Sequence, residues 1–309
     1  MNSVRISVAA VAGLVLLGAA PSAEARLSCS FSGPPENVLT VTASGFGAYP
    51  VIRRSGDLIQ VSRPFGSARN CGGDDPTVFN TDSIRVLLRH YAESDLRLDG
   101  GPFAPGATPE PDGESEIEVE FDGFVVLPSV VGTAAAEEFQ WGPGGSNPGL
   151  NLNPRTANHS DVDVDVTVKG KYSSLIADGA GGDDKIVPAP GFASRSYGLF
   201  SKGGKGSDLI IAPPNTGGVL EGGPGDDHVT GSRLRDYLIG GDGHDHLRAG
   251  AGDDLISGGH GADLIFGGPG PDRINAKHFD RDTVRCGAGR DRVKADRRDQ
   301  LRGCEKVRR

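Results

Sequence analysis

The sequence predicts an all-β protein, with a parallel β-roll (a β-solenoid) in the C-terminal half and a degenerate β-solenoid or a β-sandwich in the N-terminal half. Three observations predict this class. A nine-residue repeat runs through residues 203–294. The chain has 48 Gly but only 12 Phe, 5 Tyr and 1 Trp, a composition that suits thin layers of small side chains better than a conventional core. No segment after residue 25 shows the apolar period of an amphipathic helix.

The first 25 residues have the pattern of a cleaved signal peptide. Arg5 precedes a short apolar run, and Ala23-Glu24-Ala25 forms a small-residue cleavage site, so we expect a secreted protein that begins at Arg26. No segment reaches the roughly 20 apolar residues of a membrane span, and none is expected. The pattern then predicts a β-rich N-terminal region over 26–170, the roll over 171–294 and a basic C-terminal cap over 295–309.

Charge is distributed unevenly along the chain. The formal net charge is −9, but the tail from Ala276 onward holds 12 Lys and Arg against 6 Asp and Glu, a net of +6. The rest of the mature chain is therefore strongly acidic, which indicates cations as partners and argues against nucleic acid. For the basic tail we favour a solvated end cap over a contact with acidic polymers.

Short strands are expected in the N-terminal region, because apolar and polar residues alternate between Gly, Pro, Asn or Asp boundaries. These segments are 38–41, 58–61, 84–88, 117–121 and 162–168. Several follow an acid or amide (Asn37, Asp57, Asp82), which resembles the later repeats and favours the degenerate solenoid over the sandwich. The alternate acids at 116, 118 and 120 share one strand face and are interpreted as an acidic surface.

Six contiguous nine-residue units begin at Gly222. Position six is always Asp and position eight always aliphatic; the aspartates are Asp227, Asp236, Asp245, Asp254, Asp263 and Asp272. Similar units occur upstream at 179–187 and 203–211, the latter with Asp208, and downstream around Asp282 and Asp291. Where successive equivalent aspartates are 19 residues apart, as Asp208 and Asp227 are, one extra residue is expected to bulge from the coil.

Each unit combines a glycine-rich turn with a strand of about three residues whose position eight points inward. Two units then form one coil, and coils stack about 4.8 Å apart. The stacking would place Asp227, Asp245 and Asp263 on one edge and Asp236, Asp254 and Asp272 on the other. Carboxylates held so close repel one another and require cations, and an all-oxygen ligand set favours Ca²⁺.

These units resemble the GGxGxDxUx repeat of the RTX, or hemolysin-type, calcium-binding family, over residues 203 to about 294. The resemblance implies Ca²⁺ as the cofactor, bound between turns by the Asp at position six and the glycine carbonyls at positions two and four. The ligands it implies are Asp208, Gly223, Gly225, Asp227, Asp236, Gly241, Gly243, Asp245, Gly250, Gly252, Asp254, Gly259, Gly261, Asp263, Gly268, Gly270, Asp272 and Asp291.

The chain departs from the family pattern in three ways. The unit 231–239 (GSRLRDYLI) lacks the second and fourth glycines, which weakens the case for calcium near Asp236. The unit 212–220 has Gly217 where Asp is expected and is interpreted as a spacer. Familiar RTX proteins are exported through a C-terminal signal, whereas this chain has an N-terminal one, so the calcium chemistry is transferred here and the toxin role is not.

Four cysteines in an exported chain predict two disulfides. Cys286 and Cys304 are 18 residues apart, one whole coil, so stacking should bring them within bonding distance, and Cys29 would then pair with Cys71. Four histidines lie at variable repeat positions and are expected to be solvent-facing turn residues rather than a transition-metal site: His228, His244, His246 and His260.

Catalytic motifs are absent from the sequence: it contains no HExxH, no GxSxG and no strand–GxGxxG–helix unit. We therefore favour a non-enzymatic secreted protein in which Ca²⁺ folds and rigidifies a structural or adhesive roll. Its partner would be an unidentified cell-surface or extracellular polymer. The alternative is a secreted hydrolase or lyase with its site in residues 27–170 and the roll as a calcium-dependent folding module.

Overall fold

The computed structural model describes residues 26–34, 36–44, 49–55, 58–62, 71, 76–77, 81, 83–89, 92–97, 118–123, 126–132, 138–144, 147–151, 166–169, 176–189 and 198–309. Within these residues the chain forms strands and turns and no helix, as the sequence predicts. The signal peptide predicted for residues 1–25 lies outside them. No described helix is long and apolar enough to cross a membrane.

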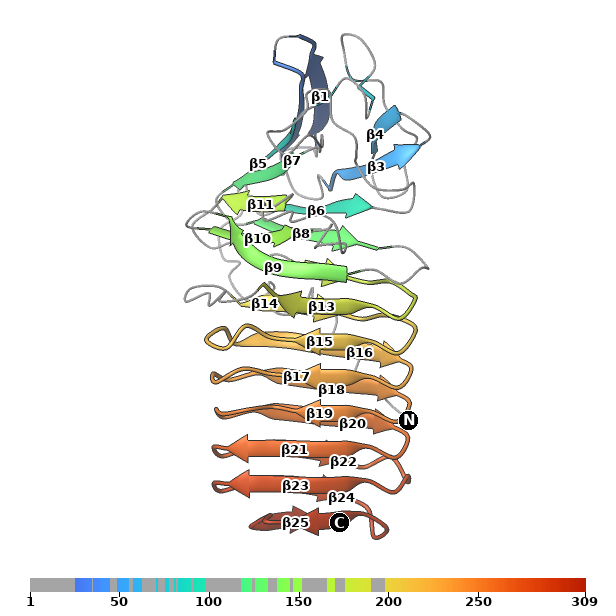
Figure 1. Cartoon of the computed structure of the whole chain (residues 1–309), viewed down its shortest axis with the longest axis vertical. Helices are drawn as coiled ribbons and strands as arrows, with labels where there is room; N and C mark the ends of the chain where they lie inside the picture. The colour runs from blue at the N-terminus through green and yellow to red at the C-terminus, as the bar shows by residue number, and fades with distance from the viewer. Residues whose placement is uncertain are drawn as a thin grey trace, which may run out of the picture.

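Two long sheets form the elongated molecule (Figure 1). Sheet A contains, in spatial order, β1 (Arg26–Ser32), β2 (Val38–Ser44), β5 (Ser83–Arg89), β7 (Glu118–Gly123), β11 (Val166–Lys169), β10 (Asn147–Asn151), β9 (Glu138–Gly144), β13 (Lys185–Pro188), β15 (Leu209–Ile211), β17 (His228–Thr230), β19 (His246–Arg248), β21 (Leu264–Pro269), β23 (Thr283–Ala288) and β25 (Gln300–Arg302).

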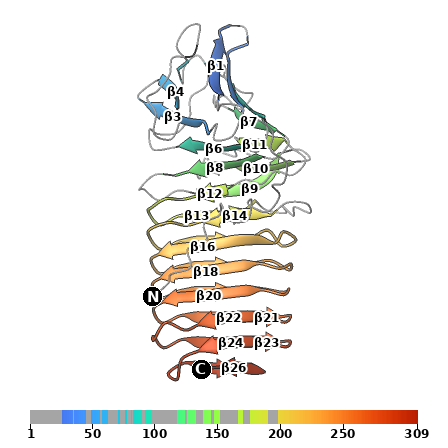
Figure 2. The ribbon, with the colours of Figure 1, turned by 180° about the vertical axis from the view of Figure 1, so that it is seen from behind.

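Sheet B lies behind sheet A in Figure 1 and in front of it in Figure 2. It contains, in spatial order, β26 (Lys306–Arg308), β24 (Arg292–Ala295), β22 (Arg273–Ala276), β20 (Leu255–His260), β18 (Tyr237–Asp242), β16 (Gly218–Pro224), β14 (Leu199–Lys202), β12 (Ile176–Asp178), β8 (Val126–Val131), β6 (Ala92–Arg97), β3 (Val51–Ser55) and β4 (Leu58–Ser62).

The predicted parallel roll is confirmed, because every strand pair from β12 and β13 to the C-terminus is parallel. Position eight of one coil pairs with position eight of the next: Val229 lies beside Leu247, and Leu247 beside Ile265. The register survives the 19-residue steps, such as Ile265 to Val284, so the extra residue is accommodated in a turn.

A thin column of small and aliphatic side chains fills the roll. The side chains at position eight are at most 2% exposed: Val229, Leu238, Leu247, Ile256, Ile265 and Ile274. Ala249, Ala276 and Ala295 complete the column beside them. Each coil thus buries only a few apolar groups. Interactions in the turns must therefore supply much of the free energy that holds neighbouring coils together.

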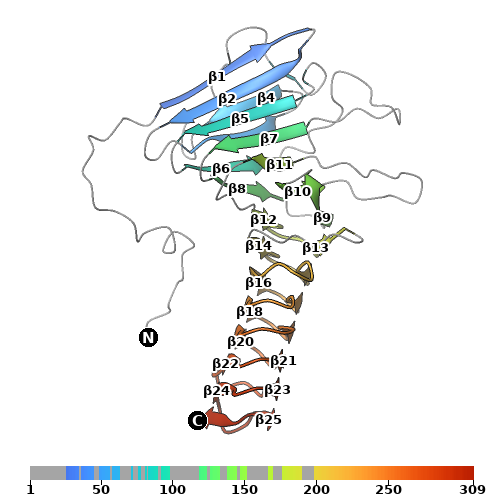
Figure 3. The same ribbon diagram turned by 90° about the vertical axis from the view of Figure 1, so that its left-hand side faces the viewer.

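The N-terminal strands continue both sheets of the roll. β2, β5 and β7 run parallel in sheet A, and β3, β6 and β8 run parallel in sheet B. Antiparallel pairs occur at β1–β2, β3–β4 and β9–β10–β11, and this end is broader than the roll (Figure 3). The topology therefore supports the degenerate solenoid rather than a separate sandwich.

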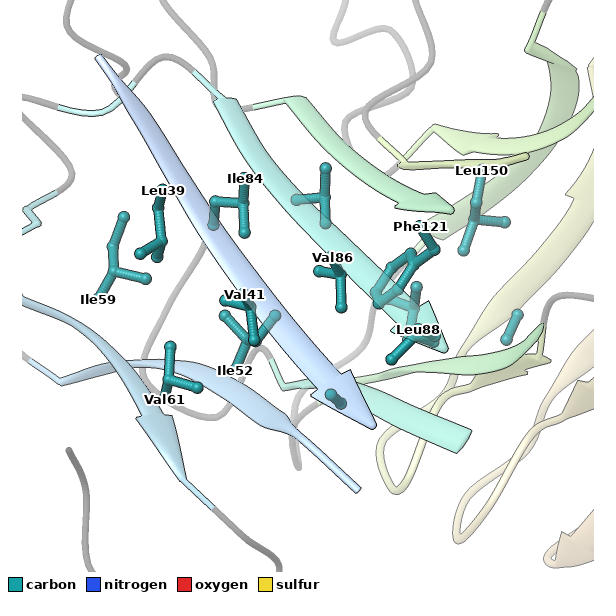
Figure 4. Packing of buried hydrophobic residues seen from close by; sticks show 14 of the residues in the cluster. Leu39, Val41, Ile52, Ile59, Val61, Ile84, Val86, Leu88, Phe121 and Leu150 are labelled. Atoms are coloured by element: carbon teal, nitrogen blue, oxygen red, sulfur yellow. The ribbon is translucent and has the colours of Figure 1, made fainter. Parts of the chain in front are cut away.

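Larger side chains fill this broader end. Leu39, Ile84 and Phe121 come from the parallel strands of sheet A and face Ile52 of sheet B (Figure 4), and all four are fully buried. The aromatic Trp141 of β9 joins the same cluster. Bulky residues occupy the greater distance between the sheets here, whereas the narrow roll accepts only aliphatic and small ones.

The five predicted N-terminal segments correspond to β2, β4, β5, β7 and β11, although β7 begins at residue 118 and β11 at residue 166. The structure describes the backbone of β7 but not the side chains of the acids at 118 and 120, and residue 116 lies outside the described residues. The tail predicted as a basic cap over 295–309 contains β25 and β26, which pair with β23 and β24 and close the roll.

Both predicted disulfides form. Cys286 and Cys304 have their Cα atoms 5.2 Å apart, and their bond ties the last coil to the coil before it. Cys29 and Cys71 have theirs 4.9 Å apart, and their bond fixes β1 to the loop that follows β4. Stacking of residues one coil apart is thus enough to place the C-terminal pair.

Candidate metal centre

The repeat aspartates stack in two columns of turns. Turn column A precedes the strands of sheet A and holds Asp208, Asp227, Asp245, Asp263, Asp282 and Asp299. Turn column B precedes the strands of sheet B and holds Asp236, Asp254, Asp272 and Asp291. All ten are buried, with exposed fractions of 6% or less. Burial of so many ionisable groups on the edges of one narrow fold demands a compensating partner.

Hydrogen bonds between coils fix one oxygen of each carboxylate. The backbone N–H of Asp227 donates to Oδ1 of Asp245 at 3.0 Å, and the N–H of Asp245 donates to Oδ1 of Asp263 at 3.0 Å. The same bond recurs along both columns. Each aspartate therefore links its own coil to the preceding one, a role that the sequence pattern alone does not reveal.

The second carboxylate oxygen has no hydrogen-bond donor in most of these turns. Among the described residues, Oδ2 is buried and without a hydrogen-bond partner in Asp208, Asp227, Asp245, Asp254, Asp263, Asp272 and Asp291. A buried polar atom without a partner costs roughly 1–3 kcal/mol, and more when it is charged. Seven such atoms at equivalent positions indicate a shared missing partner rather than chance strain.

Burial also raises the pKa of these carboxyl groups. Loss of hydration raises the pKa of Asp227, Asp263 and Asp272 to about 7, and that of Asp245 and Asp254 to about 6. The N–H donors lower these pKa values, but the charge of stacked carboxylates raises them again. At neutral pH these stacked carboxyl groups are therefore near their pKa values, and they need either protons or bound cations to offset their negative charge.

The glycines supply further oxygen atoms to the turns. All ten glycines predicted as ligands have positive φ, between 104° and 145°, which side chains rarely adopt. Gly241 and Gly243 show why no Cβ is possible: it would collide with the carbonyl oxygens of Gly223 and Gly225 in the preceding coil. The carbonyls of positions two and four thus point from each coil toward the next.

Sequence analysis missed one glycine position that shapes the site. A Cβ on the first glycine of a unit would collide with Oδ2 of the aspartate in the same unit, as at Gly222 with Asp227 and at Gly240 with Asp245. The frequent glycine at position one was the available signal. Two further aspartates extend turn column A to the last coil: Asp282, which the repeat pattern included but the predicted ligands did not, and Asp299, which the pattern did not include.

Asp236 differs from its neighbours. Its Oδ1 accepts the N–H of Gly218 at 2.7 Å and its Oδ2 accepts the N–H of Ser232 at 2.6 Å, so both oxygens already have donors. The ligand role of Asp236 stays a prediction, and Asp236 differs from its neighbours in that each of its oxygens accepts an N–H. The preceding unit also needs a correction: since Leu220 pairs with Leu238, Gly218 and not Gly217 stands at the aspartate position.

The donor set fits Ca²⁺. Carboxylate and carbonyl oxygens line the turns, and Ca²⁺ takes roughly six to eight oxygen ligands in flexible geometry. No three His, Cys, Asp or Glu side chains converge on one point among the described residues, so backbone carbonyls would have to provide many of the ligands. Positive-φ glycines allow this, whereas zinc would require imidazole or thiolate ligands.

The histidines occupy strands as well as turns, which corrects the expectation of turn positions only. His228 and His246 lie opposite each other in β17 and β19, with ring centroids 5.1 Å apart. His244 is in a turn, where its Nδ1 accepts the N–H of Ala262 at 3.0 Å. His260 lies at the end of β20, with its ring centroid 4.9 Å from that of His278, so each of the four histidines has a contact within the fold.

The comparison with protein families decides the identity of the repeats. The family model for the RTX calcium-binding nonapeptide repeat (four copies) matches residues 219–238 and 239–274. Residues 219–274 thus match the RTX calcium-binding nonapeptide repeat, as the sequence pattern predicts. The RTX match covers six aspartates of the two columns. The hydrogen bonds from the N–H of one aspartate to Oδ1 of the next, which we call the aspartate ladder, continue on both sides of the matched residues. No curated protein and no solved structure matches the chain.

Proposed function

We propose that this chain is a secreted calcium-binding protein in which Ca²⁺, held between stacked RTX turns, folds and rigidifies an extracellular roll with a structural or adhesive role. One observation carries the proposal: seven buried carboxylate oxygens at equivalent turn positions have no hydrogen-bond donor among the described residues. The RTX family match supports calcium as the cation.

Individual residues would hold the ion in defined ways. In turn column A, we assign the ion to the unpartnered Oδ2 of Asp245 and to the carbonyls of Gly223, Gly225, Gly241 and Gly243, which stack in consecutive turns. A bound Ca²⁺ supplies the positive charge that these groups require. Aspartate carboxylates accept N–H groups through Oδ1 at the same time, so the ladder keeps each ligand in place.

Calcium binding and folding are coupled in this proposal. Without a cation, repulsion and desolvation of the turn carboxylates oppose the stacking of coils, and the thin core offers little to offset them. At a hundredfold excess of ligand over its dissociation constant, each site would add about 2.7 kcal/mol to the stability of the folded state. Several sites would therefore contribute stability on the scale of a whole domain.

The extracellular setting is supported by the two disulfides, since such bonds persist mainly in oxidising compartments. Outside the cell, millimolar Ca²⁺ would fill sites that remain empty at low cytosolic concentrations. The roll would then become rigid only after export. A rigid, elongated shape suits a structural or adhesive protein that must hold a distance between two surfaces.

The test is a far-UV circular dichroism titration of residues 26–309 with CaCl₂ and, separately, MgCl₂. We expect a cooperative gain of β signal with Ca²⁺ alone, and a weaker response in the variant Asp245→Ala/Asp263→Ala. The matched control, Asp242→Ala/Asp253→Ala, removes two exposed acids that act on the turn carboxylates only through charge repulsion, so it should change the response much less than Asp245→Ala/Asp263→Ala. Full β signal in calcium-free buffer with no further change would overturn the coupling of calcium to folding.

A further inference from the structure

Five cationic side chains cover the outer surface of the last three strands of sheet B. We call them the basic face: Arg273 on β22, Arg292 and Lys294 on β24, and Lys306 and Arg308 on β26. Strand register arranges them in two rows along the axis of the roll. One row is Arg273, Arg292 and Lys306, and the other is Lys294 and Arg308. All five side chains are exposed.

This arrangement is unfavourable for the isolated roll. Like charges directly opposite each other on neighbouring strands destabilise a sheet. No acid forms an ion pair with any of the five in the part of the chain that the structure describes. Of the acids nearby in sequence, Asp282 and Asp291 are buried in the turn columns, and the carboxylate of the exposed Glu305 accepts the N–H of Asp291.

The arginines of sheet A differ, because they have a partner within the fold. Arg248 and Arg285 both lie over the ring of Phe266, at 4.6 and 5.4 Å from its centroid. Cation–π contacts of this kind stabilise the guanidinium groups where they are. The basic face of sheet B has no such ring, so its charges call for a partner from outside the molecule.

Protection of the sheet edge accounts for only part of the basic face. Charged side chains on an edge strand prevent association with another sheet, and β26 is the edge of sheet B. However, Arg292 and Lys294 lie one strand in from the edge and Arg273 lies two strands in (Figure 2). Cations at these inner positions do not shield an edge.

We propose that the basic face binds a linear anionic polysaccharide, with carboxylate or sulfate groups on repeating sugars, laid along the roll axis. Strand spacing sets the cations about 4.8 Å apart, a regular repeat that suits a polymer with regularly spaced charges. Single-stranded nucleic acid is disfavoured because the outer positions of these strands carry no aromatic side chain for base stacking. They also carry no large apolar side chain that could enter a lipid bilayer.

The inference goes beyond calcium-dependent folding and gives the adhesive role a partner class; only its extracellular setting rests on the proposed function. The test uses residues 26–309 in constant Ca²⁺, with circular dichroism of the same samples reporting folding separately from binding. Isothermal titration with heparin, polygalacturonate and neutral dextran compares sulfate, carboxylate and uncharged polymers. We expect binding to at least one of the two anionic polymers and none to dextran.

The variant Arg273→Gln/Arg292→Gln/Lys294→Gln should weaken binding at least tenfold and reduce its salt dependence. The control Arg281→Gln/Arg297→Gln/Arg298→Gln removes the same charge from exposed turns and should weaken it less than threefold. Equal losses in both variants would show unspecific charge attraction and overturn the proposal. So would tighter binding to DNA or to anionic vesicles, or failure of a folded protein to bind either anionic polymer.

Discussion

Replacing Asp245 with Asn should stabilise the roll without calcium and destabilise it with calcium. Asp245 is 2% exposed, and burial raises the pKa of its carboxyl to about 6. Asn has the same shape and keeps Oδ1, which accepts the N–H of Asp227, but it carries no charge. The substitution therefore removes the electrostatic cost of this turn and leaves its hydrogen bond in place.

The magnitude follows from the pKa. An unfolded Asp titrates near 3.9, so a folded value of about 6 makes the ionised form costlier by about 3 kcal/mol. Because the folded pKa lies above the unfolded one, the folded state binds more protons between these two pH values, and the cost grows as pH rises through that window. It is absent below pH 4 and complete above the folded pKa. Part of this cost is repulsion that Asp245 shares with Asp226 and Asp242, so the full 3 kcal/mol cannot be assigned to one carboxyl. Asp245→Asn should therefore stabilise the calcium-free protein by about 1–3 kcal/mol at pH 7.5.

The assay is the β signal of calcium-free protein between pH 4 and pH 8. Wild type should lose this signal as pH rises through 6 to 7, and Asp245→Asn should keep it to higher pH. In saturating Ca²⁺ the order should reverse, because the variant has lost a ligand. Asp253→Asn makes the same charge change at an exposed residue, which acts on Asp254 and Asp272 only through repulsion, so it should shift the β signal much less than Asp245→Asn. A variant less stable than wild type at pH 7.5 without calcium would refute the reasoning.

Gly240→Ala places a Cβ against Oδ2 of Asp245 and the carbonyl oxygen of Gly258, so the calcium midpoint of the circular dichroism transition should rise at least tenfold. Gly33→Ala, with no atom within 4 Å, is the control, and equal midpoints in the two variants would contradict the steric argument. Cys286→Ser/Cys304→Ser opens a loop of 18 residues and should cost about 3 kcal/mol in calcium-saturated thermal unfolding. An unchanged Tm would show that this bond does not hold the last coil.

The roll could be predicted because its local signals agree. Glycine positions, aspartate spacing and the inward aliphatic residue all repeat with one period, so the register of each coil follows from that of the previous one. The N-terminal strands lack this redundancy. β6 has the polar sequence AESDLR and β8 contains Pro128, yet both form because β3 and β12 pair on either side. Tertiary pairing overrides weak strand propensity there.

Within the site, the sequence could locate aspartates but could not tell which oxygens have a donor. Asp236 and Asp245 occupy the same repeat position, and they differ because the N–H of Ser232 reaches Oδ2 of Asp236. The last coil shows the converse. Asp299 lies 17 residues after Asp282, outside the repeat spacing, yet it accepts the N–H of Asp282 because β25 pairs with β23. Turn geometry decides the first case and strand pairing the second, and the repeat pattern encodes neither.

At the C-terminal end of the roll, other groups take the place of the next aspartate. Each turn aspartate accepts an N–H from the preceding coil, so a cation bound between two coils would also stabilise the proposed ligands of the next pair, and the coils should behave as a cooperative row. The row must stop where no further coil can supply an acceptor. There the carboxylate of Glu305 accepts the N–H of Asp291, and the Cys286–Cys304 bond joins the last two coils covalently. A disulfide therefore secures the last coil, which has a neighbour on one side only.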